Sequence, residues 1–171
     1  MTTFFAATDD DLLVTAHGHG QLRAELEALR TVGRAAITEQ LREAREDRDP
    51  DNPMLFDLLE EQAQVEGRIN QLETQLAAAR VVAPAGNGTA GIGSVVRVRH
   101  CDSGEVAEYD LVGSIESDVG NGRVSVGAPV GRALVGRVSG ETVVAETPRG
   151  TQQLEILAVL AADRPAAKKA A

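Results

Sequence analysis

Residues 53–80 read PMLFDLLEEQAQVEGRINQLETQLAAAR. Apolar residues recur there at alternating steps of three and four, which is the spacing of one face of a coiled-coil helix. The predicted seam consists of Leu55, Leu58, Gln62, Val65, Ile69, Leu72, Leu76 and Ala79. The segment is therefore predicted to be a helix that packs on a partner along its length.

A second run with the same spacing lies upstream, between Gly18 and Glu46. Its predicted seam consists of Leu22, Leu26, Leu29, Gly33, Ala36, Gln40 (flanked by Leu41) and Ala44. Pro50 is expected to end the first helix, and Pro53 suits the first turn of the second. Because so short a connection forces neighbouring helices to run antiparallel, we expect a hairpin. At roughly 1.5 Å per residue, helices of about 28 residues would hold the acidic tip about 40 Å from the other end.

The character of the chain changes after Pro84. A Gly-rich stretch follows, and beyond it the period becomes two, with Val96 and Val98 alternating with arginines. This alternation is typical of half-buried strands. One short helix is predicted to begin at Pro129 and to end at Gly136. The expected fold class is α+β: an antiparallel two-helix coiled coil followed by a small antiparallel sheet with one short helix.

The predicted organisation has five parts. They are a mobile leader (1–16), a coiled-coil hairpin (17–82) with an acidic tip (46–52), a linker (83–93), a sheet domain (94–161) and a disordered tail (162–171).

Composition narrows the function. The net charge of −9 argues against binding to duplex nucleic acid through its phosphates, because that mode of binding needs a clustered basic face on the protein. No stretch approaches the roughly 18 apolar residues of a membrane span. The single cysteine, Cys101, permits no internal disulfide, and we expect it to be a buried structural thiol. These features predict a cytoplasmic protein without a membrane partner.

One nine-residue string is specific enough to point to a family. Residues 128–136 read APVGRALVG, which resembles the SPIARALIG string of the Gre factors, bacterial proteins of the GreA/GreB type. Four shorter strings support the resemblance: EARE (43–46), EGRI (66–69), YDLVG (109–113) and TPRG (147–150).

The resemblance implies a partner and a way of binding it. In this family the C-terminal domain has an FK506-binding-protein-like (FKBP-like) fold and docks on the rim of the secondary channel of RNA polymerase. The matching string places this contact at Pro129, Val130 and Arg132. The coiled coil then passes down the channel to the polymerase active centre. The resemblance thus implies a monomeric transcription elongation regulator that is not itself an enzyme and has no cofactor of its own.

The tip departs from the family pattern. In the cleavage factors of the family, a tip Asp and Glu help to hold a second Mg²⁺ at the polymerase active site. Matching the flanking strings places Asp49 and Asp51 on these two positions, with Glu46 and Asp47 nearby. The stretch that matches the family string is one residue shorter and contains two prolines, Pro50 and Pro53. An Asp side chain also reaches roughly 1 to 1.5 Å less far than a Glu, and misplacements of that size cost catalysis heavily.

Two readings of the tip follow from this departure. In the first, the factor modulates or inhibits elongation through its acidic tip. In the second, it is a transcript-cleavage factor that rescues backtracked complexes, with Asp49 and Asp51 as metal ligands that share Mg²⁺ with the polymerase.

Two remote alternatives complete the set. A plain coiled-coil adaptor would have no role at an active centre. A prolyl isomerase would need the aromatic pocket walls of an FKBP-like enzyme, yet Tyr109 is the only aromatic residue after the linker.

Overall fold

The computed structural model of the protein describes residues 13–46, 53–84, 86, 88–148 and 150–161. The chain folds as two units. One unit is formed by residues 19–78, and the other joins the chain up to Gly18 to the chain from Ala79 onward. The predicted leader before residue 13 and the tail after residue 161 lie outside the described residues.

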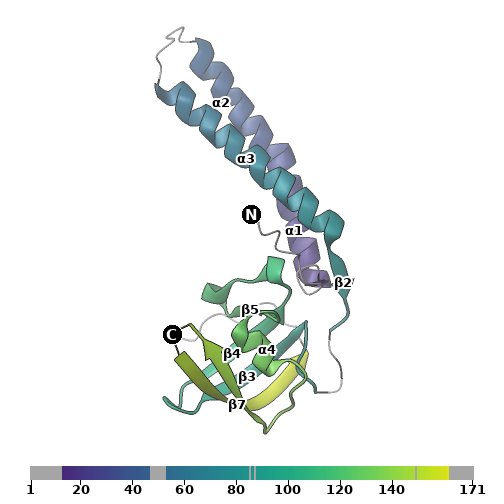
Figure 1. Ribbon diagram of the computed structural model, residues 1–171. Coiled ribbons are helices and arrows are strands. Elements are labelled where there is room, and N and C mark those ends of the chain that lie inside the picture. Colours follow the sequence, from purple (N-terminus) through teal and green to yellow (C-terminus); the bar gives the residue numbers. More distant parts are fainter. Residues whose placement is uncertain (1–12, 47–52, 85, 87, 149, 162–171) are drawn as a thin grey trace, which may run out of the picture. The chain divides into compact units, whose positions relative to one another are not determined.

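The first unit is the predicted helical hairpin. Its first arm is made of α1 (Ala16–Ala28), the π-helical segment η2 (Leu29–Gly33) and α2 (Arg34–Glu46). The second arm is α3 (Pro53–Ala78), which runs antiparallel beside the first (Figure 1). Pro53 is the first residue of α3, as expected for a residue that lacks an N–H and has a fixed φ.

The seam of the first arm differs from the prediction beyond Gly33. Ala36 and Gln40 are exposed, whereas Ile37 and Leu41 are buried, with 4% and 5% of their surface exposed. The shift follows η2, because a π-helical turn adds one residue, and the seam returns to the predicted residue at Ala44, which is 7% exposed. The seam therefore takes three successive steps of four, from Leu29 through Gly33 and Ile37 to Leu41.

Ion pairs link the outer edges of the two arms. Arg34 Nε and Nη2 donate to the two carboxylate oxygens of Glu66 at 2.7 and 2.6 Å. Arg30 reaches Glu73 at 2.6 Å, and Arg68 reaches Glu25 at 2.8 Å. The side chains of each pair are about 40% or more exposed, so each pair contributes little to the free energy of unfolding. These pairs contribute more to the register of the arms than to their stability.

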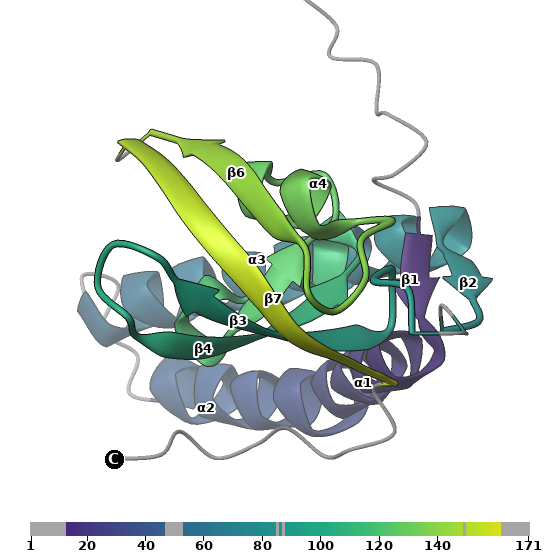
Figure 2. The same ribbon diagram turned by 90° about the horizontal axis from the view of Figure 1, so that it is seen from below.

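The second unit contains a five-stranded sheet. The strands are β3 (Ser94–His100), β4 (Val106–Val112), β5 (Arg123–Ser125), β6 (Thr142–Thr147) and β7 (Gly150–Ala161), in the order β5-β4-β3-β7-β6. The short helix α4 (Pro129–Leu134) covers one face of this sheet (Figure 2). The alternation predicted for β3 is observed, since Val96 and Val98 are buried in the core under α4. The α+β fold class is therefore confirmed.

One pairing in the sheet is not antiparallel as predicted. β5 runs parallel to β4, with Leu111 opposite Val124. Parallel neighbours need a connection that returns the chain to the same end of the sheet. Here the chain returns through two 3₁₀ turns, η3 (Ser114–Glu116) and η4 (Val119–Asn121).

A small parallel sheet corrects the predicted end of the leader. β1 (Leu13–Thr15) pairs with β2 (Arg80–Val82), so the leader does not extend to residue 16. The reason is burial, because the side chain of Val14 is completely enclosed. The linker is also shorter than predicted, since Ala90 is buried and its N–H donates to the carbonyl of Arg137 at 2.8 Å.

Two further observations bear on the predictions from composition. Cys101 is exposed, which corrects the expectation of a buried thiol. It follows the last residue of β3 and belongs to the turn before β4, where side chains face solvent. Across the part of the chain that the structure describes, no helix has the length and apolar character that a membrane crossing requires.

Candidate functional site

The hairpin tip is framed by two helix ends. α2 ends at Glu46 and α3 begins at Pro53. The predicted tip residues Asp47, Asp49 and Asp51 lie between these ends, outside the described residues. Glu46 is exposed, and its Oε1 accepts a hydrogen bond from Arg42 Nη1 at 2.9 Å.

Arg42 binds one carboxylate that precedes it in α2 and one that follows it. Besides Glu46, it donates from Nε and Nη2 to Glu39 at 3.1 and 2.6 Å. The hydrogen bond from Arg42 lowers the pKa of Glu39, and the positive charge of the guanidinium adds to this effect. Glu46 is thus held close to a cation, which reduces the negative charge that it presents at the tip.

The hairpin seam loosens toward the tip. Ile69 and Leu72 are fully buried near the other end of α3, whereas Leu55 and Leu58 are only half-buried. Gln62 is exposed although it lies on the predicted seam. Beside it is an open hollow of about 530 Å³, lined by Thr38, Leu41, Arg42, Arg45, Glu46 and Gln62.

The described residues do not form a metal site by themselves. No group of three or more His, Cys, Asp or Glu side chains among them is placed to hold an ion. The predicted ligands Asp49 and Asp51 fall in the segment that is not described. Metal binding at the tip therefore stays a prediction.

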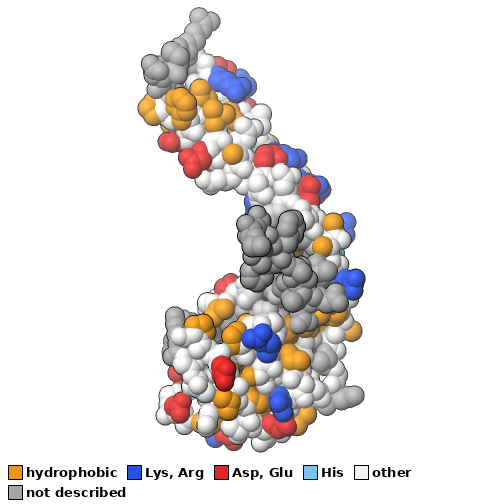
Figure 3. All heavy atoms as spheres, in the orientation of Figure 1, with side chains coloured by type: hydrophobic (Ala, Val, Ile, Leu, Met, Phe, Trp, Pro, Cys, Tyr) orange, Lys and Arg blue, Asp and Glu red, His pale blue; other side chains and the backbone are white. Residues whose placement is uncertain are grey.

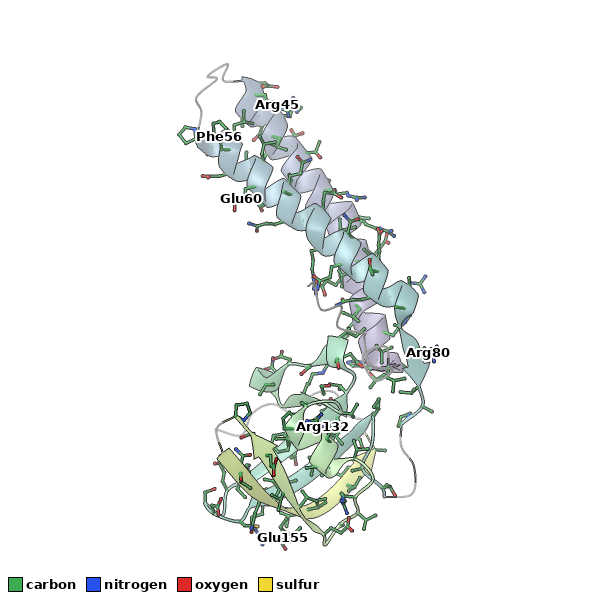
Figure 4. All side chains as sticks on the ribbon, in the orientation of Figure 1. Arg45, Phe56, Glu60, Arg80, Arg132 and Glu155 are labelled. Atoms are coloured by element: carbon green, nitrogen blue, oxygen red, sulfur yellow. The ribbon has the colours of Figure 1, made fainter. Side chains whose placement is uncertain are left out.

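The predicted docking residues lie together on α4. Pro129 is the first residue of the helix, and Ala128 before it is extended, with φ −74° and ψ 158°. Arg132 is exposed (Figure 4), whereas Pro129 and Val130 are half-buried. Arg132 therefore lies at the surface, whereas Val130 packs partly against the sheet core.

The backbone on both sides of α4 is firmly held. Before the helix, Ser125 Oγ accepts from the N–H of Gly127 at 3.1 Å and lies 3.0 Å from Ser114 Oγ. After it, Gly136 takes φ +78°, which favours glycine, and its N–H donates to the carbonyl of Ala90 at 2.8 Å. These bonds fix where α4 begins and ends.

The second unit contains a polar cluster that sequence reasoning missed. Glu116 has a side chain only 1% exposed. Its carboxylate accepts from Thr15 N at 2.7 Å, from Thr15 Oγ1 at 2.6 Å and from Arg123 Nη2 at 3.0 Å. The cluster attaches the strand β1 to the segment between β4 and β5. Glu116 follows Gly113 by three positions and belongs to no periodic pattern in the sequence, so nothing there identified it as a buried residue.

Asp110 lies beside this cluster, opposite Arg123 in the β4–β5 pairing. Burial raises the pKa of Asp110 above its ordinary value, and the negative charge of Glu116 adds to the rise. The charges of Arg123 and His17 oppose it. The cluster thus contains a carboxyl group that the fold holds in a partly unfavourable environment.

Comparison with known proteins identifies the family. The family model described as "Transcription elongation factor, GreA/GreB, C-term" matches residues 85–161. The model described as "Transcription elongation factor, N-terminal" matches residues 12–81. The two matches follow one another along the chain and cover both units.

Similar proteins agree with these matches. The transcription elongation factor GreA of Alkalilimnicola ehrlichii is 39% identical over 150 residues, which are 85% of this chain and 95% of that protein. GreA of Alkaliphilus oremlandii is also 39% identical, over 88% of this chain and 97% of that protein. Among solved structures, the GreA factor homolog 1 (Gfh1) of Thermus thermophilus is 29% identical, with a TM-score of 0.41, and the alignment covers 87% of this chain and 98% of that one. The order of the matched domains and the identity over nearly the whole length of these relatives show that the chain belongs to the GreA/GreB family of transcription elongation factors.

Proposed function

We propose that the protein is a transcription elongation regulator that binds RNA polymerase and inserts its coiled coil into the secondary channel. The observation that carries this proposal is the hairpin of α2 and α3, whose turn is acidic, within a chain matched by both domain models of the family. In this role the protein acts on the polymerase and performs no catalysis of its own.

The docking contact is assigned to α4. Arg132 is exposed on a helix whose two ends are fixed by backbone hydrogen bonds, so little order has to be gained when a partner binds. Gly127 and Ala128 precede the helix and bring no charged side chain to its start. Arg132→Ala should therefore weaken polymerase binding, because Arg132 is the charged residue of the predicted contact.

The tip modulates or inhibits elongation in this proposal. Asp49 and Asp51 carry negative charge to the end of the hairpin, while Glu46 is bound by Arg42. The stretch that matches the family string is one residue shorter and contains Pro50 and Pro53, which argues against a placement of both carboxylates on one metal ion. Because catalysis is sensitive to shifts of about 1 Å, charge can be retained while cleavage is lost.

Transcript cleavage remains the second candidate, and one feature favours it. Asp49 and Asp51 preserve two carboxylates at the tip, and hard oxygen ligands of this kind suit Mg²⁺. A second divalent ion at the polymerase active site would stabilise the attacking and leaving oxygens during hydrolysis of the RNA 3′ end.

One assay separates the two candidates. Purified protein is added to polymerase halted on a backtracked transcript, and the RNA lengths and the rate of further synthesis are followed. Slower synthesis with intact RNA supports modulation or inhibition. Shortened RNA that can be extended again, and that is lost in Asp49→Ala or Asp51→Ala, supports cleavage.

The same assay tests the adaptor alternative, and a peptide assay tests the prolyl isomerase. A coiled-coil adaptor without a role at the active centre would tolerate Asp49→Ala and Asp51→Ala with no change in either readout. A prolyl isomerase would accelerate cis–trans exchange in a proline peptide without polymerase. Failure of the protein to bind polymerase at all would overturn the proposed function.

A further inference from the structure

A glycine lies where α4 contacts the turn that precedes it. Gly131 and Leu134 are the two buried residues of α4. A Cβ added to Gly131 would lie 2.0 Å from the carbonyl oxygen of Ser125 and 2.9 Å from the Cα of Val126. Only a residue without a side chain therefore allows the helix to lie this close to the turn. We call the contact between Gly131 and the Ser125 carbonyl the α4 seat.

The turn before α4 is held by hydrogen bonds of its own. Ser125 is in β5 and pairs with Val112 of β4, and the N–H of Val126 donates to the carbonyl of Val112 at 3.0 Å. The carbonyl of Ser125 accepts from the N–H of Ala128, also at 3.0 Å. A side chain at position 131 would therefore displace the helix rather than the turn, by about 1 Å before its Cβ was 3.0 Å from the Ser125 oxygen.

Helix propensity does not explain a glycine at this position. Alanine is preferred to glycine inside a helix, so Gly131 lowers the intrinsic stability of α4. The SPIARALIG string has alanine here, and the glycine is thus a departure of this chain from that string. What the glycine provides is the close packing of α4 against Ser125.

The residue after Gly131 is Arg132, the charged residue of the predicted docking contact. Four other arginines of the sheet unit each have a carboxylate within 4.0 Å: Arg97, Arg99, Arg123 and Arg137. Among the described residues, no carboxylate lies that close to Arg132. Figure 3 shows basic side chains among hydrophobic ones on the side of the sheet unit that carries α4. The exposed guanidinium of Arg132 is therefore available to a carboxylate of a partner.

The seat and the charged residue are consecutive in one helical turn, so a displacement of Gly131 also moves Arg132. Hydrogen bonds between a guanidinium and a carboxylate depend on the alignment of two planar groups. We propose that Gly131 is a positioning residue for the docking contact: the α4 seat sets where the guanidinium of Arg132 meets a carboxylate of RNA polymerase. This inference rests on the proposed function, because it concerns the same binding site.

The experiment is a double-mutant cycle. Binding of the full chain to immobilised polymerase is measured for the wild type, Gly131→Ala, Arg132→Ala and the double variant. Gly131→Ala should weaken binding by about tenfold in the wild-type background and by less than about twofold in the Arg132→Ala background. A variant that was only less stable would lose binding by the same factor in both backgrounds. The cycle thus separates positioning from a general loss of stability.

Two controls accompany the cycle. Gly120→Ala makes the same change in an exposed turn of the sheet unit, where the added Cβ would lie 3.4 Å from Asp118 Oδ1, and it should bind like the wild type. Ile156→Val removes one carbon from the core of this unit. It should lower the melting temperature and leave binding unchanged. Thermal unfolding records the stability of every variant.

A second variant decides the question if Gly131→Ala does not fold. Ser125 Oγ accepts from the N–H of Gly127 at 3.1 Å and lies 3.0 Å from Ser114 Oγ. Ser125→Ala removes these bonds and adds no atom, so it loosens the turn against which α4 packs. It should weaken binding by about threefold, and only while Arg132 is present.

The inference is overturned if Gly131→Ala binds like the wild type, or if it weakens binding by the same factor with and without Arg132. For a Gly131→Ala variant that does not fold, the same two outcomes in Ser125→Ala overturn it. In each of these cases the binding of the wild type leaves the proposed function intact. If the wild type itself fails to bind polymerase, both proposals fall.

Discussion

Thr15 Oγ1 donates a hydrogen bond to Glu116 Oε1 at 2.6 Å, across 101 positions of sequence. The same carboxylate accepts from the Thr15 N–H and from Arg123. A carboxylate this deeply buried is tolerated because its oxygens are satisfied and a cation lies beside it. The relationship makes the β1 strand a structural part of the sheet unit.

Removing this carboxylate should therefore be costly. Glu116→Ala removes the acceptor of the Thr15 N–H and the carboxylate beside the Arg123 guanidinium, and we expect the free energy of unfolding to fall by about 3 kcal/mol. Urea denaturation gives the value directly. Hydrogen exchange at the amide of Thr15 should accelerate in the folded variant, because β1 loses its anchor.

A surface ion pair supplies the control. Glu108 lies 3.9 Å from Arg97, and both side chains are about half exposed. Glu108→Ala should change the free energy of unfolding by less than about 1 kcal/mol. Equal losses in Glu108→Ala and Glu116→Ala would show that the buried cluster has no special role.

Gly18 lies against the same carboxylate. A Cβ added at Gly18 would come within 1.6 Å of Glu116 Oε1, whereas one added at Gly20 meets nothing within 4 Å. Both glycines are in α1, where alanine is intrinsically preferred by roughly 1 kcal/mol. We expect Gly18→Ala to lower the melting temperature and Gly20→Ala to raise it. A stabilising Gly18→Ala would contradict the close approach of helix and carboxylate.

The periodic parts of the fold were predictable, and the local exceptions were not. The heptad spacing of Ile69 and Leu72 and the alternation of Val96 and Val98 result from burial on one face, which repeats along the sequence. The π-helical turn at Leu29–Gly33 adds a single residue, and its stretch LRTVG carries no signal that separates it from an ordinary helix. Glu116 was missed because Thr15, to which it is hydrogen-bonded, lies 101 positions away in the sequence. The tip could be located from its flanks, but its geometry lies outside the described residues.

The shifted seam can be tested by substitution. Leu41 is buried and Gln40 is exposed, although the predicted seam passed through Gln40 with Leu41 as its flanking residue. Leu41→Ala should cost about 2 to 4 kcal/mol, because it leaves a cavity between the arms. Gln40→Ala should change the free energy of unfolding by less than about 0.5 kcal/mol. Denaturant unfolding of the two variants decides between the seams, and a larger loss in Gln40→Ala would restore the predicted one.

Asp110 predicts a dependence of stability on pH. Burial, followed by the charge of Glu116, raises the pKa of this carboxyl above 3.8, against the opposing charges of Arg123 and His17. The folded state therefore holds the proton more tightly than the unfolded state. The stability that this group contributes is complete below pH 3.8 and is lost as the pH rises through the raised pKa.

Asp110→Asn should accordingly be more stable than the wild type at pH 7, because asparagine cannot ionise. The difference in melting temperature should shrink as the pH falls toward 3.8, because folded Asp110, whose pKa is raised above this value, is then protonated. Circular dichroism melting curves measure this difference from about pH 3.5, below the ordinary pKa of an aspartate, to about pH 8. Asp102→Asn, in the exposed turn after β3, separates the effect of burial from that of net charge. If Asp110→Asn is less stable than the wild type at pH 7, attraction to Arg123 outweighs burial and the predicted sign is wrong.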